Sequence, residues 1–228
     1  MDILLIAGLW LDGSAWDEVL PGLVERGHRP VPVTLPQHGA ATLDDQLTAV
    51  LAALAETTGP ALVVGHSAAC TLAWLAADAR PDEVAGVAFV GGFPVADGRV
   101  YFDLIEPVGG IVDFPGWEPF AGPDSADLDD AARERFATAA IPVPEGVATA
   151  VVGLTDARRY DIPVTVVCPE FGPDDARGWI AAGQVPELAK VSTLAYADID
   201  SGHWPMITRP AELAELLADA TRVSGKHP

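Results

Sequence analysis

Apolar runs alternate with amphipathic stretches along most of the chain, and this alternation predicts the secondary structure. Short continuous apolar runs are typical of buried strands, and apolar residues three or four positions apart are typical of helices. The runs predict strands over residues 2–7, 30–35, 61–64, 84–90, 162–168 and 192–199. The stretches between them predict helices over residues 14–26, 42–56, 68–77, 174–182 and 209–223. Strands that alternate with helices favour an α/β fold with a mostly parallel sheet and helices on both faces.

Several polar residues and prolines refine these elements. Ser14 and Thr42 each precede a helical stretch, where a side-chain oxygen can accept a bond from a free backbone amide. Pro30 and Pro32 lie in the second predicted strand, and proline cannot donate to a sheet ladder. We therefore expect this strand at or near an edge of the sheet. The tail after Ser224 is expected to fray.

The alternation stops between residues 93 and 160. This segment holds many of the prolines, an acidic run over residues 124–130, and helical patterns over residues 127–139 and 145–154. It is too long for a simple connection, and open α/β sheets bind ligands at the carboxyl ends of their strands. We therefore expect a core of residues 1–92 and 161–228, with residues 93–160 forming a small, largely helical cap over that edge of the sheet.

One serine lies where a predicted strand turns directly into a predicted helix. Gly65 and Ala69 lie two residues before and two residues after Ser67, which gives the pattern G-x-S-x-small. Such a turn exposes the serine hydroxyl above the sheet and needs small neighbours, because the strand and helix backbones nearly touch. The amide of Ala68 and the helix dipole would then face the same point. The alternative is a buried strand and a tight turn in which Ser67 only caps the helix.

Composition and charge narrow the function classes. The net charge of -20 disfavours nucleic acid and anionic membrane surfaces as partners. Cys70 and Cys168 lie in apolar stretches and have neither disulfide-framework nor metal-ligand spacing. The apolar run at the N-terminus is too short for a signal peptide or a membrane span, so a cytoplasmic setting is expected. Because metal and nucleotide motifs are missing from the sequence, we expect neither a metal nor another cofactor.

The order of these motifs resembles the α/β-hydrolase family over essentially the whole chain. The resemblance is narrower to small capped members that include plant hydroxynitrile lyases and methyl-ester esterases. In those proteins an H-G-x-W-x-x-x-x-W pattern follows the first core strand, and residues 7–16 match it except that Ala7 replaces the histidine. The chain begins at the strand that carries this loop, so we expect a sheet of about six strands.

The resemblance implies roles for particular residues. Ser67 matches the nucleophile, and His203, in the loop after the last strand, matches the base that takes its proton. Leu9 and Ala68 match the two backbone donors of the oxyanion hole. The alternative interpretation of His203 is a capping or solvent-exposed loop residue.

Four carboxylates are candidates for the acid that would orient His203, because the family's Gly-x-x-Asp is replaced by Pro169-Glu170-Phe171-Gly172. Glu170 is the first choice, since it follows a predicted strand directly and has a long side chain. Asp97, Asp174 and Asp200 are the alternatives, in that order.

Together these features predict a cofactor-independent serine hydrolase that cleaves a small ester, thioester or lactone through an acyl-enzyme. Trp10, Trp117 and Trp204 are candidates for contact with this small-molecule substrate, with core packing as the alternative. A lyase built on the same site would want a nearby cation, and the cap segment has no lysine. A binding protein that keeps the pocket without turnover is the third possibility. The sequence leaves the oligomeric state open, a homodimer included.

Overall fold

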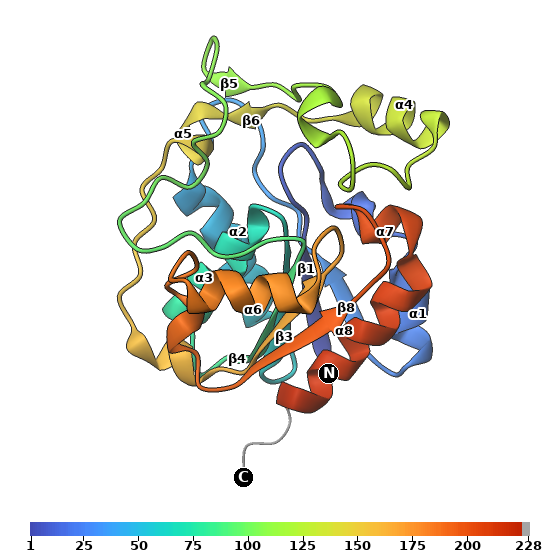
Figure 1. Ribbon diagram of the computed structural model, residues 1–228. Helices are drawn as coiled ribbons and strands as arrows, with labels where there is room; N and C mark the ends of the chain where they lie inside the picture. Colours follow the sequence, from blue (N-terminus) through green and yellow to red (C-terminus); the bar gives the residue numbers. More distant parts are fainter. Residues whose placement is uncertain (225–228) are drawn as a thin grey trace.

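The computed structural model describes residues 1–224 and centres on a six-stranded sheet (Figure 1). The strands follow the spatial order β2-β1-β3-β4-β7-β8, and every neighbouring pair is parallel. Their bounds are β1 Asp2–Ile6, β2 Arg29–Pro32, β3 Ala61–His66, β4 Val84–Val90, β7 Val164–Cys168 and β8 Leu194–Asp198. The expected fold class and strand number are both confirmed, and the proline-containing strand β2 lies at an edge.

The strands β1, β3 and β7 are buried and largely apolar, which is typical of a parallel sheet covered on both faces. Their register aligns the carboxyl ends that carry the site. Ile6 pairs with Gly65, and His66 pairs with Val90. The loops that follow β1, β3 and β4 therefore leave the sheet side by side.

Helices pack against both faces of the sheet. In Figure 1, α1 and α8 lie together on one side and α2 and α3 on the other, in agreement with their mutual contacts. The helices outside the 93–160 segment are α1 Leu20–Glu25, α2 Leu43–Ala55, α3 Ala69–Ala79, α6 Pro173–Ala181, α7 Pro205–Thr208 and α8 Pro210–Ser224. Thr42 caps α2 as expected, and its hydroxyl accepts a hydrogen bond from the amide of Asp45 at 3.2 Å.

The first predicted helix differs from the observed structure. A 3₁₀ turn, η1 Gly13–Trp16, precedes the short α1, and the N-cap of this turn is Asp12, whose carboxylate accepts from the amide of Ser14. Pro21 and Gly22 lie in the first turn of α1. Proline removes a donor and is tolerated only near a helix start, so the continuous pattern is divided at this point.

Residues 93–160 leave the sheet, and most of the segment up to α5 lies above the carboxyl ends of the strands, whereas its last part runs down the side of the molecule to η3 (Figure 1). The segment is less regular than expected, with two short strands that pair antiparallel as well as helices. Its elements are β5 Ile111–Val112, η2 Glu118–Phe120, α4 Asp130–Ala139, β6 Val143–Pro144, α5 Glu145–Ala148 and η3 Ala157–Asp161. The pattern over residues 145–154 forms only the short α5.

A buried ionic cluster fastens the end of this segment to α3. The carboxylate of Asp78 accepts hydrogen bonds from the amides of Thr155 and Asp156 and pairs with Arg159 at 3.0 Å. Arg159 also pairs with Glu187, and both side chains are almost fully buried. Breaking such a pair would leave a buried charge uncompensated, so the cluster fixes the segment on the core.

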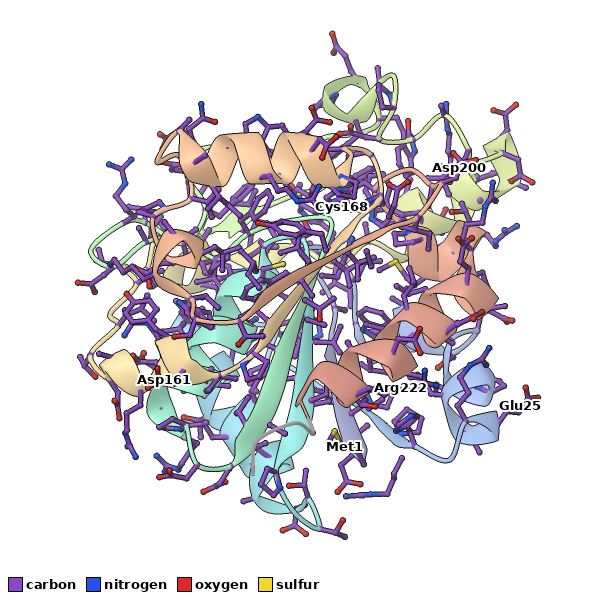
Figure 2. All side chains as sticks on the ribbon, turned by 60° about the horizontal axis from the view of Figure 1, so that its bottom comes forward. Met1, Glu25, Asp161, Cys168, Asp200 and Arg222 are labelled. Carbon is purple, nitrogen blue, oxygen red and sulfur yellow. The ribbon has the colours of Figure 1, made fainter. Side chains whose placement is uncertain are left out.

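None of the helices within residues 1–224 has the length and apolar character that a membrane crossing demands. Cys70 and Cys168 are buried free thiols. Figure 2 shows Cys168 in the interior at the end of β7. The tail after Ser224, for which fraying is predicted, lies outside the described residues.

Candidate active site

Ser67 occupies the sharp turn between β3 and α3 in a left-handed backbone conformation, with φ of +55°. The surrounding backbone is packed so closely that only small residues fit. A Cβ on Gly65 would overlap the backbone carbonyl of Ala69, and a Cβ on Gly92 would lie 2.8 Å from the carbonyl oxygen of Ser67. A non-glycine residue in this conformation is held there by the structure around it. Backbone strain thus falls on the residue that carries the candidate nucleophile.

The structure brings Ser67, His203 and Glu170 into one hydrogen-bonded chain. The Nε2 atom of His203 lies 2.9 Å from Oγ of Ser67, and its Nδ1 atom lies 2.6 Å from Oε1 of Glu170. A carboxylate only accepts, so Nδ1 carries the proton and Nε2 is left to accept from the serine hydroxyl. The His203 and Glu170 side chains are 14% and 15% exposed. The arrangement can draw the proton from Ser67 and hold the resulting imidazolium beside a carboxylate.

The other three candidate carboxylates have different surroundings. Asp97 accepts a hydrogen bond from the amide of Leu154 at 2.9 Å. Asp174 is almost fully exposed and pairs with Arg177. Asp200 lies on the surface, toward the rim of the molecule in Figure 2. Of the four candidates, only Glu170 is placed against His203.

His66, the residue before Ser67, contacts the same histidine from below. Its Nε2 atom lies 2.8 Å from the backbone carbonyl oxygen of His203, so Nε2 is the donor. Complete burial lowers the pKa of His66 to about 3, and this keeps the ring neutral. Its Nδ1 atom has no hydrogen-bond partner among the described residues. That atom faces Gly8, where a Cβ would lie only 2.8 Å away.

The predicted oxyanion donors lie beside the serine. A Cβ on Gly8 would lie 3.1 Å from Cβ of Ser67, so the loop after β1 approaches the nucleophile closely. Within residues 1–224, neither the amide of Leu9 nor that of Ala68 donates to a protein group. Trp10, in the same loop, has a left-handed backbone conformation, with φ of +63°. Its indole donates to the carbonyl of Val112 at 3.2 Å.

A cleft of about 620 Å³ opens at Ser67 and Ala68. Its walls come from the loop after β4, from the start of the cap segment, and from the turn after α6. They are largely apolar, and the side chains that define its shape are those of Phe93, Val95, Arg99, Tyr101, Phe102 and Gln184. This volume suits an organic molecule of moderate size. Across residues 1–224, no group of three or more His, Cys, Asp or Glu side chains is arranged to hold a metal ion.

The three predicted tryptophans lie in an aromatic cluster beside the cleft, and none of them is among the residues that line it. Trp204 contacts the ring of His203, with 4.9 Å between centroids. Trp117 packs against Trp204 at 5.3 Å. Trp10 packs against Phe102, which does line the cleft, at 6.0 Å. Direct contact of the three indoles with substrate stays a prediction.

Sequence reasoning missed two kinds of residue near the site. The cleft walls at Arg99, Tyr101 and Gln184 carry no motif, and only the three-dimensional fold places them together. In the acidic run, Asp129 caps α4, and its side chain accepts from the amide of Ala132 at 2.7 Å. Asp127 in the same run instead contacts the His203 loop.

The electrostatic environment of the base is acidic. Burial and the nearby Glu170 charge raise the pKa of Asp124, whose backbone carbonyl accepts from the amide of His203 at 2.7 Å.

The parallel sheet, the strained serine turn and the histidine in the last loop define an α/β-hydrolase. Residues 3–216 match the α/β-hydrolase family, and the chain belongs to it. A pyrethroid hydrolase from Sphingobium wenxiniae is 26% identical over an alignment of 250 positions, which spans 96% of this chain and 86% of that enzyme.

Solved structures show the same fold. An extracellular α/β-hydrolase from a Paenibacillus species superimposes with a TM-score of 0.77 at 18% identity and covers 96% of this chain and 98% of that one. Polyneuridine aldehyde esterase superimposes with a TM-score of 0.71 at 16% identity and covers 96% and 98% of the two chains. The family match over residues 3–216 supports a hydrolase.

Proposed function

We propose that the protein is a cofactor-independent serine hydrolase that cleaves a small ester, thioester or lactone. The observation that carries this proposal is the unbroken hydrogen-bonded chain from Ser67 through His203 to Glu170, with Ser67 itself lining an open cleft. A serine hydroxyl is a weak nucleophile until a base takes its proton, and here the base and its orienting acid are both within hydrogen-bond distance.

The reaction begins when Oγ of Ser67 attacks the substrate carbonyl carbon while Nε2 of His203 takes the hydroxyl proton. Glu170 holds the imidazolium, and the amides of Leu9 and Ala68 bind the oxyanion that forms. The tetrahedral intermediate collapses, the leaving group takes the proton from His203, and an acyl-enzyme remains. Water then attacks the acyl-enzyme with His203 as base, which releases the acid and restores Ser67.

The comparisons support an ester substrate. The relative that matches most of the chain is called a pyrethroid hydrolase, and one structural neighbour is called an esterase. The apolar walls of the cleft favour a substrate with an apolar group next to its carbonyl. We also infer a reducing compartment such as the cytoplasm, and the two free thiols support it.

The lyase alternative would want a cation beside Ser67. Among residues 1–224 no lysine lines the cleft, and the cationic side chain there is that of Arg99, which stays protonated and cannot exchange a proton as a lysine does. Lys190 lies at the other end of the cap segment, where it bonds the hydroxyl of Tyr160, and Lys226 is outside the described residues. A binding protein without turnover would have no need of a base aligned on the serine. The hydrogen bonds that connect Ser67, His203 and Glu170 therefore disfavour this hypothesis as well.

Labelling with a fluorophosphonate tests the proposal, because the probe reacts only with an activated serine. We expect one label per chain, located on Ser67 by peptide mass spectrometry, and turnover of at least one member of a panel of p-nitrophenyl esters, thioesters and lactones. A protein that neither labels nor turns over any of these substrates would contradict the proposal.

A further inference from the structure

The loop that carries His203 is held by the cap segment as well as by the core. Oδ2 of Asp127 accepts a hydrogen bond from the amide of Gly202 at 2.8 Å and another from the hydroxyl of Ser201 at 3.2 Å. One residue further on, the amide of His203 donates to the carbonyl of Asp124 at 2.7 Å. Two consecutive backbone amides, one of them that of the base itself, thus donate hydrogen bonds to residues 124–127.

The cap segment lies so close to the His203 loop that residue 202 has no room for a side chain. A Cβ on Gly202 would overlap both the carbonyl oxygen of Asp124 and the Oδ1 atom of Asp127. Gly202 is buried. The missing side chain therefore allows the cap segment to reach the loop backbone directly.

This arrangement is separate from the capping of α4. The side chain that caps the helix is that of Asp129, which accepts from Ala132. The hydrogen bonds that the Asp127 carboxylate accepts come from Ser201 and Gly202, 74 and 75 residues away in the chain. Two neighbouring acids of one run thus serve different parts of the molecule.

We propose that Asp127 is a positioning residue that fixes the His203 loop, so that the cap segment takes part in aligning the base with Ser67. A carboxylate is a strong acceptor for backbone amides, and an error of about 1 Å in the position of a catalytic group can cost about a hundredfold in rate. The inference rests on the proposed function, because it assigns a partner to the proposed base. It also implies that displacement of the cap from the loop switches off chemistry before it affects binding.

The test compares Asp127→Ala, Asp127→Asn, Gly202→Ala and the matched control Asp129→Ala. Asn keeps an oxygen that can accept from the Gly202 amide, and Asp129→Ala removes a helix cap from the same acidic run without touching the His203 loop. The measurements are the rate constant of fluorophosphonate labelling, kcat and KM on one ester, and the melting temperature of each variant.

We expect Asp127→Ala to lower the labelling rate and kcat by about ten- to hundredfold with KM changed by less than about twofold. Asp127→Asn should recover most of the loss. Gly202→Ala should show the same kinetic pattern with Asp127 intact. Asp129→Ala should lower the melting temperature while keeping kcat within about threefold of wild type.

Four outcomes would overturn the inference: wild-type labelling in Asp127→Ala, no recovery in Asp127→Asn, wild-type kinetics in Gly202→Ala, or an equal loss in Asp129→Ala. Failure of the proposed function looks different. In that case the wild-type protein does not label at Ser67, and the inference falls together with the function.

Discussion

The side chain of His66 donates a hydrogen bond to the backbone carbonyl of His203, with 2.8 Å between Nε2 and the oxygen. The residue next to the nucleophile thus supports the backbone of the base. The two imidazole rings lie 5.0 Å apart between centroids. Because His66 is fully buried, this bond depends on a ring that stays neutral. The stability of the folded protein in acid therefore depends on a residue that supports the active-site base.

The first prediction is a loss of stability in acid that depends on His66. Its pKa is about 3 in the folded protein against an ordinary 6.5, so the unfolded chain binds the proton first as the pH falls. The stability that the neutral ring contributes is therefore complete above 6.5 and is lost progressively as the pH falls toward the folded value. In that window one proton changes the free energy of unfolding by up to about 1.4 kcal/mol per pH unit.

The variant His66→Gln keeps an amide donor for the His203 carbonyl but does not titrate. Urea unfolding of both proteins between about pH 7 and about pH 4 should give a steeper decline for the wild type. Other groups that titrate, such as Asp2, are common to both proteins and cancel in the difference of slopes. Parallel curves would show that His66 is already protonated or solvated in the folded state.

The second prediction concerns the strain at Ser67. Both Ser67→Ala and Ser67→Gly remove the nucleophile and should abolish labelling and turnover. They should differ in stability, since φ of +55° disfavours alanine but not glycine. After the greater freedom of glycine in the unfolded chain is subtracted, Ser67→Gly should be more stable than Ser67→Ala by about 1 kcal/mol in urea unfolding. Equal stabilities would mean that the turn relaxes once the hydroxyl is gone.

The third prediction separates the acid of the triad from its nearest competitor. Glu170→Gln keeps the shape of the side chain but favours the wrong tautomer of His203, and turnover should fall by roughly two to four orders of magnitude. Ser67 should still label, though slowly. Asp97→Asn keeps an oxygen that can accept from Leu154 and should turn over at close to the wild-type rate. The reverse pattern would move the acid to the loop after β4.

Much of the fold follows from the sequence because its signals are local and repeated. The buried strands, the edge position of Pro30 and Pro32 and the Thr42 cap each depend on a few neighbouring residues. The first helix was predicted wrongly because Pro21 and Gly22 outweigh an apolar spacing that looks continuous. The cap was predicted as largely helical, but its short β5–β6 pair has too few residues to produce a period of two.

The residues of the site also differ in whether a local sequence signal predicts them. Ser67 is found from its turn, and His203 and Glu170 are found from the strands that they follow. Asp127 carries no comparable signal, because its partner Gly202 is 75 residues away and the bond is to a backbone amide. The cleft walls are also non-local. Phe102 and Gln184 meet only after the chain has folded.

The last prediction concerns the aromatic residues that set substrate preference. Phe102 lines the cleft, whereas Trp117 packs against Trp204, which in turn contacts His203. Phe102→Ala should therefore change the ranking of acyl groups in a panel of p-nitrophenyl esters, with long apolar groups affected more than acetate.

Trp117→Ala should leave a cavity behind the base and lower the rate on all esters to a similar degree, together with the melting temperature. The two variants form a matched pair, since each removes one aromatic ring from the same cap segment. If Trp117→Ala instead changed the ranking and left the acetate rate intact, Trp117 would contact the substrate directly, as its place in the sequence first suggested.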